Sequence, residues 1–139
     1  MNALVDTSVW SLALRHHLRH LGAVERSVTD ELNALIQEGR ARIIGLVRQE
    51  LLSGIKASSQ YEKLRETLRA FPDERIEIED YEAAAKASND CRSRGITVSV
   101  VDVLICEVAR ARRWSVFTTD PDFANYAKIF PIQLHTPRR

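Results

Sequence analysis

Long apolar runs are missing from this sequence. No stretch approaches the roughly 20 consecutive apolar residues that a membrane-spanning helix requires, so we expect no transmembrane segment. The first residues, Met1 to Asp6, also lack the basic start and the apolar middle of a secretory signal peptide. These two absences predict a cytoplasmic protein that is not bound to a membrane.

Cysteine is scarce, and neither sign of charge is in excess. The two cysteines, Cys91 and Cys106, fit no metal or redox spacing. Both lie among apolar residues of expected helices, which favours buried free thiols. The 20 Lys and Arg residues nearly balance the 19 Asp and Glu residues, giving a net charge of +1. An RNA partner would therefore have to be bound by a local basic patch, because the overall charge supplies no attraction.

Repeats, linkers and low-complexity tracts are absent too, and 139 residues are about the size of one domain, so we expect a single domain over 1–139. What is present is an alternation of short apolar segments with amphipathic ones. The pattern predicts strands at 3–5, 42–45, 75–79, 115–117 and 132–134, and helices at 8–21, 29–38, 46–52, 59–70, 80–94 and 99–112. This order is typical of an α/β fold in which helices cover both faces of a mostly parallel sheet of about five strands.

Acidic residues follow two of the predicted strands, at the edge where such folds bind their ligands. Asp6 comes directly after the strand at 3–5, and Asp120 and Asp122 follow the strand at 115–117. Each has an alternative interpretation. Asp6 could cap the helix that it precedes, and an Asp before Pro121 is common in simple turns. We expect one of Asp120 and Asp122 to serve only in the turn.

Two further acids lie on helices that could border the same edge. Glu50 shares a helix face with Leu46 and Val47, although it could also be a rim residue whose carboxylate reaches water. Asp102 lies in an apolar segment, and Ser99-x-x-Asp102 matches a helix capping box. Capping and a role in a site are compatible, because a carboxylate in the first turn points out from the helix end.

Four carboxylates that converge in one cleft repel one another and resist ionisation. A hard divalent cation relieves this repulsion, and a set of oxygen ligands favours Mg²⁺ or Mn²⁺ over zinc. Such a cation can activate water and stabilise the charge on a phosphate under attack. The acids therefore indicate phosphodiester hydrolysis.

The acidic segments resemble the PIN-domain family, and specifically the VapC-type toxins of bacterial toxin–antitoxin pairs. The order, spacing and total length of the segments agree with a single PIN domain, so the resemblance covers essentially the whole chain. The opening Asp-Thr-Ser and the closing Thr-x-Asp-x-Asp-Phe are jointly specific, and the Glu50 segment is less so. The matching segments are Leu4 to Trp10, Arg48 to Leu51, Val101 to Ile105, and Phe117 to Phe123.

The resemblance implies a three-layer α/β/α sandwich and a Mg²⁺- or Mn²⁺-dependent endoribonuclease that cuts structured RNA such as tRNA or rRNA. It also implies a homodimer that is silenced by a cognate antitoxin protein. Asp6, Glu50 and Asp102 would be metal-site residues, with Asp120 as the fourth acid and Asp122 as a further candidate ligand. The hydroxyl partners that orient water or carboxylates would be Thr7, Ser8 and Thr119.

Two other functions fit parts of the pattern. A phosphatase or phosphotransferase on a similar sheet could use Asp6 as its nucleophile, but phosphatases of the haloacid dehalogenase type usually carry a second Asp where this chain has Ser8. A non-catalytic module that binds RNA or protein is the third possibility, and the presence of all the acids argues against it.

Overall fold

The computed structural model describes residues 1–15 and 21–138. Along these residues, short strands alternate with helices. The elements are, in chain order, β1 (Ala3–Val5), α1 (Thr7–Leu14), α2 (Ala23–Gln37), β2 (Ala41–Arg42), α3 (Gly45–Leu52), α4 (Ser58–Leu68), α5 (Ile78–Ser93), α6 (Val100–Arg112), β3 (Ser115–Phe117), α7 (Asp122–Tyr126) and β4 (Gln133–Leu134).

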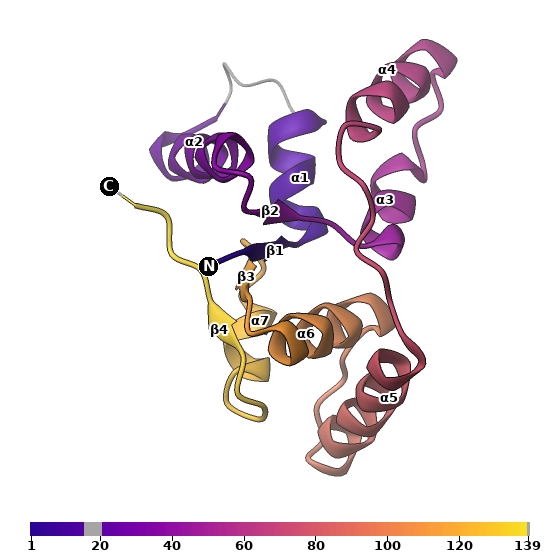
Figure 1. The fold of residues 1–139 in the computed structure, drawn as a ribbon, viewed down its shortest axis with the longest axis vertical. Coiled ribbons are helices and arrows are strands. Elements are labelled where there is room, and N and C mark those ends of the chain that lie inside the picture. Colours follow the sequence, from indigo (N-terminus) through magenta and orange to yellow (C-terminus); the bar gives the residue numbers. More distant parts are fainter. Residues whose placement is uncertain (16–20, 139) are drawn as a thin grey trace.

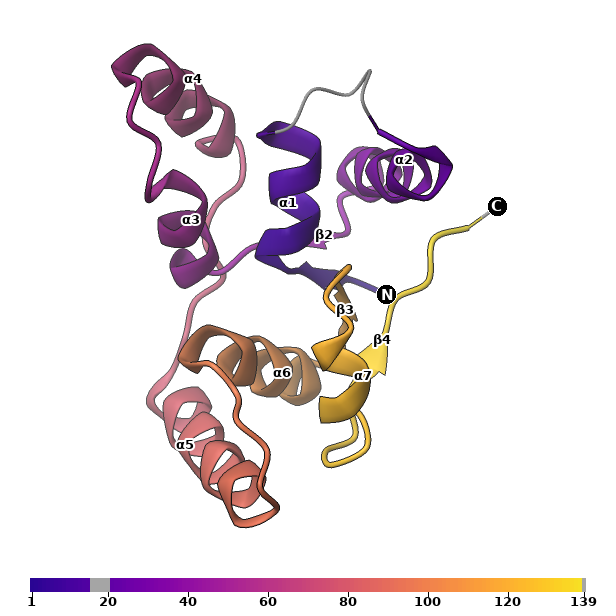
Figure 2. The same ribbon diagram turned by 180° about the vertical axis from the view of Figure 1, so that it is seen from behind.

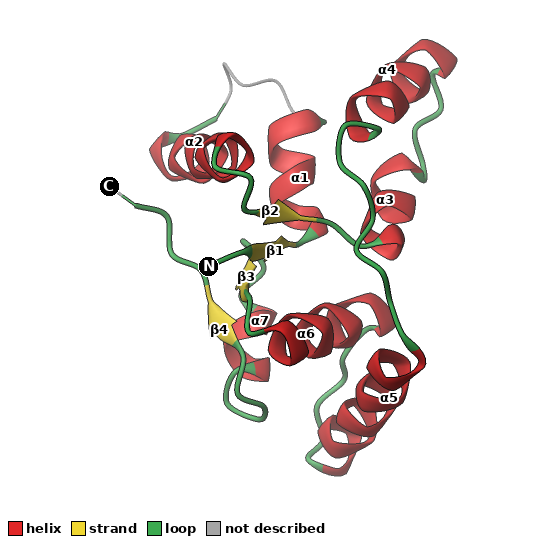
Figure 3. Cartoon of the chain, viewed as in Figure 1, coloured by secondary structure: helices red, strands yellow, loops and turns green. Residues whose placement is uncertain are grey.

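The strands form one parallel sheet in the order β2-β1-β3-β4 (Figure 3). Leu4 of β1 pairs with Arg42 of β2 on one side and with Val116 of β3 on the other. Every residue of β1 and β3 is buried, whereas β4 is exposed at the edge of the sheet. The continuous apolar character of β1 follows from this position, because a central parallel strand is covered on both faces.

Helices cover the sheet on both sides, which confirms the predicted α/β sandwich. Figures 1 and 2 show α1 and α2 on one side and α6 and α7 on the other. Helix α3 packs against α1 and α4 packs against α3, while α5 packs against α6. The largest buried side chain is Trp10 of α1, whose indole N–H donates to the Val5 carbonyl at 3.2 Å and whose ring contacts Phe71.

The predicted strand at 75–79 is wrong, and the sheet of the described residues has four strands rather than about five. Asp73 makes only an isolated bridge to Ile43. Helix α5 then begins at Ile78, which is 72% exposed. The reason is a capping box: Glu77 caps the helix, and its backbone N–H donates to the Asp80 carboxylate at 2.8 Å. This local bond competes successfully with strand pairing.

Other element boundaries differ less. Helix α2 begins at Ala23 instead of Thr29, and the first helix is described over Thr7–Leu14, while 16–20 of its predicted range lie outside the described residues. Cys91 and Cys106 are buried free thiols, as predicted. Among the helices of the described segments, none is long and apolar enough to cross a membrane.

Candidate active site

The pairing of β1 with β3 brings two polar segments together at the carboxyl edge of the sheet. Val5 is opposite Phe117 in parallel register, and the backbone N–H of Asp6 donates to the Phe117 carbonyl at 2.8 Å. The residues that follow these strands, Asp6 and Thr118, therefore leave the sheet side by side. This is the edge at which the sequence predicts the site.

Asp6 is the most deeply buried acid of this edge, with 4% of its surface exposed. Its Oδ2 atom accepts hydrogen bonds from the Ser8 hydroxyl and the Thr118 hydroxyl, each at 2.8 Å. Asp6 occupies the N-cap position of α1, but its side chain makes no cap hydrogen bond. The simple capping interpretation therefore fails, and the carboxylate is held in place by hydroxyl groups that leave Oδ1 available.

Thr118 is the residue that the sequence analysis missed. Its hydroxyl donates to Asp6 and accepts from the backbone N–H of Asp120 at 3.0 Å. Thr119 had been expected to supply a hydroxyl partner, but its contact with the network is through its backbone N–H, which donates to Ser8 Oγ at 3.0 Å. The parallel pairing of Val5 with Phe117 explains the difference, because it places Thr118 directly beside Asp6.

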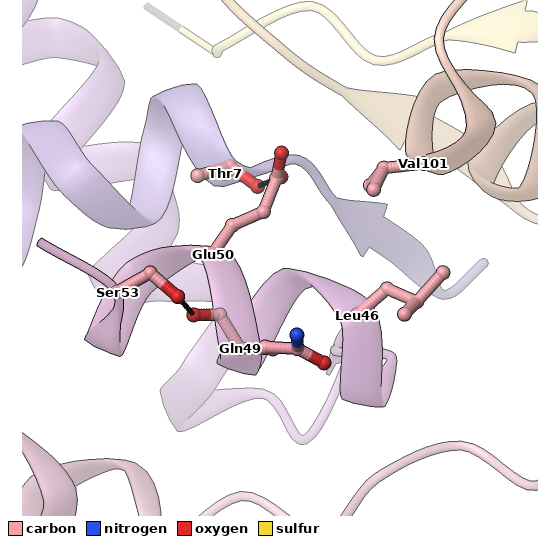
Figure 4. A pocket seen from close by; sticks show the side chains of 6 residues that line it. All are labelled: Thr7, Leu46, Gln49, Glu50, Ser53 and Val101. Atoms are coloured by element: carbon pink, nitrogen blue, oxygen red, sulfur yellow. Dashed lines mark hydrogen bonds between the residues drawn. The ribbon is translucent and has the colours of Figure 1, made fainter.

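Glu50 reaches the site from α3. The Thr7 hydroxyl, at the start of α1, donates to Glu50 Oε1 at 2.6 Å (Figure 4). Because α1 and α3 pack together, this bond fixes an exposed carboxylate beside the end of β1. Thr7 thus has the orienting contact that was expected of it.

Asp102 lies in the first turn of α6. The Ser99 hydroxyl caps this helix by accepting from the backbone N–H of Asp102 at 3.0 Å. The cap uses the backbone of Asp102, so its carboxylate is available for another role. Burial is the largest cause that raises the pKa of this carboxyl, and the negative charge of Asp6 is the next. Asp120 and Glu50 also raise it, and the pKa reaches about 6.

The two candidate acids after β3 take different positions. The negative charge of Asp120 is one of the causes, after burial and Asp6, that raise the pKa of Asp102. Asp120 Oδ1 also accepts from the backbone N–H of Asp122 at 2.9 Å, so it shapes the turn as well. Asp122 is the first residue of α7, and its charge acts on Tyr126. The charge of Asp120 acts on both Asp102 and Tyr126, and the choice of Asp120 as the fourth acid stays a prediction.

Tyr126 is a second neighbour of the acids that the sequence analysis did not single out. Its hydroxyl donates to Asp102 Oδ2 at 3.5 Å, and only 3% of the residue is exposed. Burial and the negative charges of Asp102 and Asp122 raise the pKa of this phenol, so it stays protonated and remains a donor. The sequence gives little indication of this contact, because α7 is a helix of only five residues.

The acids that converge at this edge come from four places in the sequence, and we call them the strand-end cluster: Asp6, Glu50, Asp102 and Asp120. Their donors are all oxygen, which suits Mg²⁺ or Mn²⁺. In 1–15 and 21–138, no three His, Cys, Asp or Glu side chains already surround one point closely enough to hold a metal ion. This spacing still fits Mg²⁺, because that ion usually takes one or two carboxylates and keeps several waters.

Comparison with known proteins agrees with this architecture. A sequence profile of the PIN domain matches residues 3–129. The structure of VapBC2 from Rickettsia felis, bound to a DNA fragment from their promoter, is similar with a TM-score of 0.72 at 18% identity, covering 97% of this chain and 98% of that chain.

Two further structures show the same fold. FitAcB from Neisseria gonorrhoeae gives a TM-score of 0.73 at 19% identity, with 97% of each chain covered. A toxin–antitoxin complex from Klebsiella pneumoniae gives 0.69 at 20% identity, with 99% of each chain covered. No curated protein matches the sequence significantly.

Proposed function

The chain belongs to the PIN-domain family, and from this premise we propose that it is a Mg²⁺- or Mn²⁺-dependent endoribonuclease. The observation that carries the proposal is the strand-end cluster itself. Four acids, from the residue after β1, from α3, from α6 and from the β3–α7 turn, gather at the carboxyl edge of the sheet, where burial and then the negative charges of the other three raise the pKa of Asp102. A cluster that repels itself is a site for a cation, and a cation beside a phosphodiester supports hydrolysis.

In this proposal Asp6 and Asp102 hold the cation, which when bound polarises a phosphate oxygen and lowers the pKa of a water. The protein fixes the geometry. Ser8 and Thr118 orient the Asp6 carboxylate through Oδ2, and Thr7 orients Glu50. Because Glu50 is exposed while Asp6 is buried, Glu50 is placed to accept the proton of the attacking water.

We further propose that the chain is the toxin of a toxin–antitoxin pair, that its substrate is structured RNA such as tRNA or rRNA, and that it acts in the cytoplasm as a homodimer. The support for the antitoxin is the likeness to the toxin–antitoxin complex from Klebsiella pneumoniae. The neighbouring gene is therefore expected to encode a short partner protein that co-purifies with this chain and relieves its toxicity.

The alternative reaction, phosphotransfer through Asp6, receives no support from the geometry. Oδ2 of Asp6 is already engaged by Ser8 and Thr118, and the residue is almost fully buried. Ser8 also occupies the position at which the expected second Asp of such phosphatases would stand, and it contacts Asp6 as a structural partner. A nuclease that uses Asp6 as a metal ligand needs only its free oxygen.

The proposal is tested by cleavage of total RNA with Mg²⁺ or Mn²⁺ and with EDTA. Asp6→Asn and Asp102→Asn should each lower the rate by several orders of magnitude, because water activation fails without a ligand to the cation. Circular dichroism should show that both variants keep the fold. The matched control is Asp30→Asn, which changes an exposed acid on α2 and should cleave as the wild type does. Near wild-type cleavage by either site variant would remove that residue from the site.

A further inference from the structure

An open cavity of about 420 Å³ adjoins the strand-end cluster, a volume in the range of small-molecule sites. It lies between α3 and the first turn of α6 (Figure 4). Its lining consists of Thr7, Leu46, Gln49, Glu50, Ser53 and Val101. Glu50 belongs both to the cavity lining and to the strand-end cluster, so the cavity is next to the place where a ligand of the acids would bind.

Two of the six residues that line the cavity are apolar. Leu46 of α3 and Val101 of α6 are both only partly buried, and Figure 4 shows the Leu46 side chain directed towards Val101. Exposed apolar groups beside an acidic site attract a flat, weakly hydrated surface, and the faces of an unpaired nucleobase are such a surface. A phosphate is not attracted, because Glu50 is the charged residue of the lining.

One wall carries a hydrogen-bonding group without a protein partner. The Ser53 hydroxyl donates to the backbone carbonyl of Gln49 at 2.6 Å. This hydrogen bond uses the backbone of Gln49 and not its side chain. Across the parts of the chain that the structure describes, the Gln49 side-chain amide has no hydrogen-bond partner. It is exposed on α3 and offers two N–H donors and one carbonyl acceptor, the groups that pair with the edge of a base.

We propose that this cavity binds one unpaired nucleobase next to the scissile phosphate, with Leu46 and Val101 against its faces and Gln49 hydrogen-bonded to its edge. The inference rests on the proposed function, since it names the part of the RNA that the site reads. Gln49 is then a specificity-determining residue that touches the substrate but not the reacting atoms. The Gln49 amide pairs with a base edge that offers a donor beside an acceptor. The contacts of Leu46 and Val101 with the base faces require an unstacked base, which is the usual target of sequence-specific RNA recognition.

The first test is a nuclear magnetic resonance titration in Mg²⁺ with the common ribonucleoside 5′-monophosphates, using ribose 5-phosphate as the probe without a base. At least one nucleotide should shift the side-chain N–H₂ signals of Gln49 and the methyl signals of Leu46 and Val101, while ribose 5-phosphate should not. Gln49→Leu should weaken binding of that nucleotide roughly tenfold. The control Gln37→Leu, at the exposed end of α2, should bind as the wild type does.

Equal shifts with ribose 5-phosphate, or nucleotide shifts confined to other residues, would overturn the inference. The inference is also overturned if nucleotides do not shift the signals of the cavity residues while a co-purified partner protein covers the cavity, because the cavity is then a protein contact.

The second test separates the inference from the proposed function. Cleavage sites on total RNA are mapped by sequencing for wild type, Gln49→Leu and Gln37→Leu. The wild type and Gln37→Leu should share a base preference at one position beside the cut, and Gln49→Leu should lose it. If the wild type cuts RNA and Gln49→Leu keeps the preference, the inference is wrong and the nuclease stands. If the wild type cuts no RNA but nucleotides bind at Gln49, the nuclease is wrong and the base pocket stands.

Discussion

The strand-end cluster can be compared with a second group of acidic side chains, which contains its own cations. The second group, which we call the C-terminal cluster, joins α2 to the end of the chain: Glu31, Glu38, His135 and Arg138. Arg138 contacts Glu31 and Glu38 at 2.7 Å each, and His135 contacts Glu31 at 2.5 Å. Across the described residues, no Lys, Arg or His makes an ion pair with the strand-end cluster.

The pKa of Asp102 in the strand-end cluster moves in the opposite direction from the pKa values of Glu31 and Glu38 in the C-terminal cluster. Burial raises the pKa of Glu31, but the hydrogen bonds from His135 and Arg138 outweigh it, and the pKa is lowered. Hydrogen bonds from Arg138 and Arg40 lower the pKa of Glu38 to about 2. Burial raises the pKa of Asp102, its acidic neighbours raise it further, and it reaches about 6.

This difference separates an acidic cluster that stabilises the fold from one that awaits a ligand. The C-terminal cluster is neutralised within the chain and ties two distant segments together. The strand-end cluster is held by hydroxyl groups, which orient its carboxylates without neutralising them. Residual electrostatic strain of this kind is common at functional sites.

The largest stability effect is expected in the C-terminal cluster. Glu31→Gln should lower the free energy of unfolding by about 2 kcal/mol at neutral pH, because Glu31 is 3% exposed and its loss removes the acidic partner of His135 and one of the two acidic partners of Arg138. RNA cleavage should be unchanged. Since the folded pKa of Glu31 is lowered, its contribution is full above the unfolded value of 4.5 and is lost as the pH falls through the folded value.

Urea unfolding of the wild type and Glu31→Gln at pH 7 and near pH 4 measures this effect, with Asp30→Asn as an exposed control on the same helix. A Glu31→Gln variant that unfolds like the wild type at pH 7 would show that the two clusters do not differ in this way.

A smaller effect of opposite sign is expected at Asp102. Without metal, Asp102→Asn should raise the free energy of unfolding at pH 7 by about 1 kcal/mol, after allowance for solvent screening, because it removes a carboxylate whose charged form is disfavoured. The folded pKa is raised, so the wild type loses stability relative to the variant as the pH rises from about 4 to about 6. The advantage of the variant should therefore be full above pH 6 and absent below pH 4.

Urea unfolding in EDTA across this pH range is the measurement. If Asp102→Asn is less stable than the wild type at pH 7, the acid stabilises the helix and the comparison between the clusters fails.

The smallest effect concerns how the strand-end cluster is positioned. Tyr126→Phe should lower the rate of RNA cleavage about threefold, because it removes one long hydrogen bond to Asp102 and keeps the ring that packs against Phe123. Stability should be nearly unchanged. The measurement is cleavage as a function of Mg²⁺ concentration, with Tyr81→Phe, an exposed residue of α5, as the control. If Tyr126→Phe and the control cleave RNA at the same rate at every Mg²⁺ concentration, Tyr126 has no positioning role.

The sequence predicted the site best where one rule of the fold applied. The structure brings Asp6 and the Asp120 segment to the same edge, as predicted from the rule that the carboxyl ends of parallel strands meet there, while the choice of Asp120 over Asp122 came from the family resemblance. The position of Glu50 depended on the family resemblance, since a mid-helix acid carries no comparable signal. Thr118 was missed because the choice between neighbouring threonines depends on strand register, and Tyr126 because its contact with Asp102 depends on how a short helix packs.

The fold class was predicted correctly, but the strand predicted at 75–79 was wrong for similar physical reasons. The alternation at 75–79 is that of a strand, yet the capping box between Glu77 and Asp80 begins a helix there. The contact between Asp80 and Arg112 at 3.0 Å, which supports this arrangement, joins residues far apart in the sequence. The pairing of Arg138 with Glu31 is equally remote in the sequence. Patterns within a short window carry no information about such contacts.

The most direct test of the account is whether a divalent cation supplies the counter-charge that the strand-end cluster lacks. Thermal melts of wild type, Asp102→Asn and Glu31→Gln are compared in EDTA and in Mg²⁺. The account predicts that Mg²⁺ stabilises the wild type, by about 2.7 kcal/mol at roughly a hundredfold excess over the dissociation constant, and stabilises Glu31→Gln by the same increment, while Asp102→Asn loses most of it. An equal increment in all three proteins, or none in the wild type, would contradict the account.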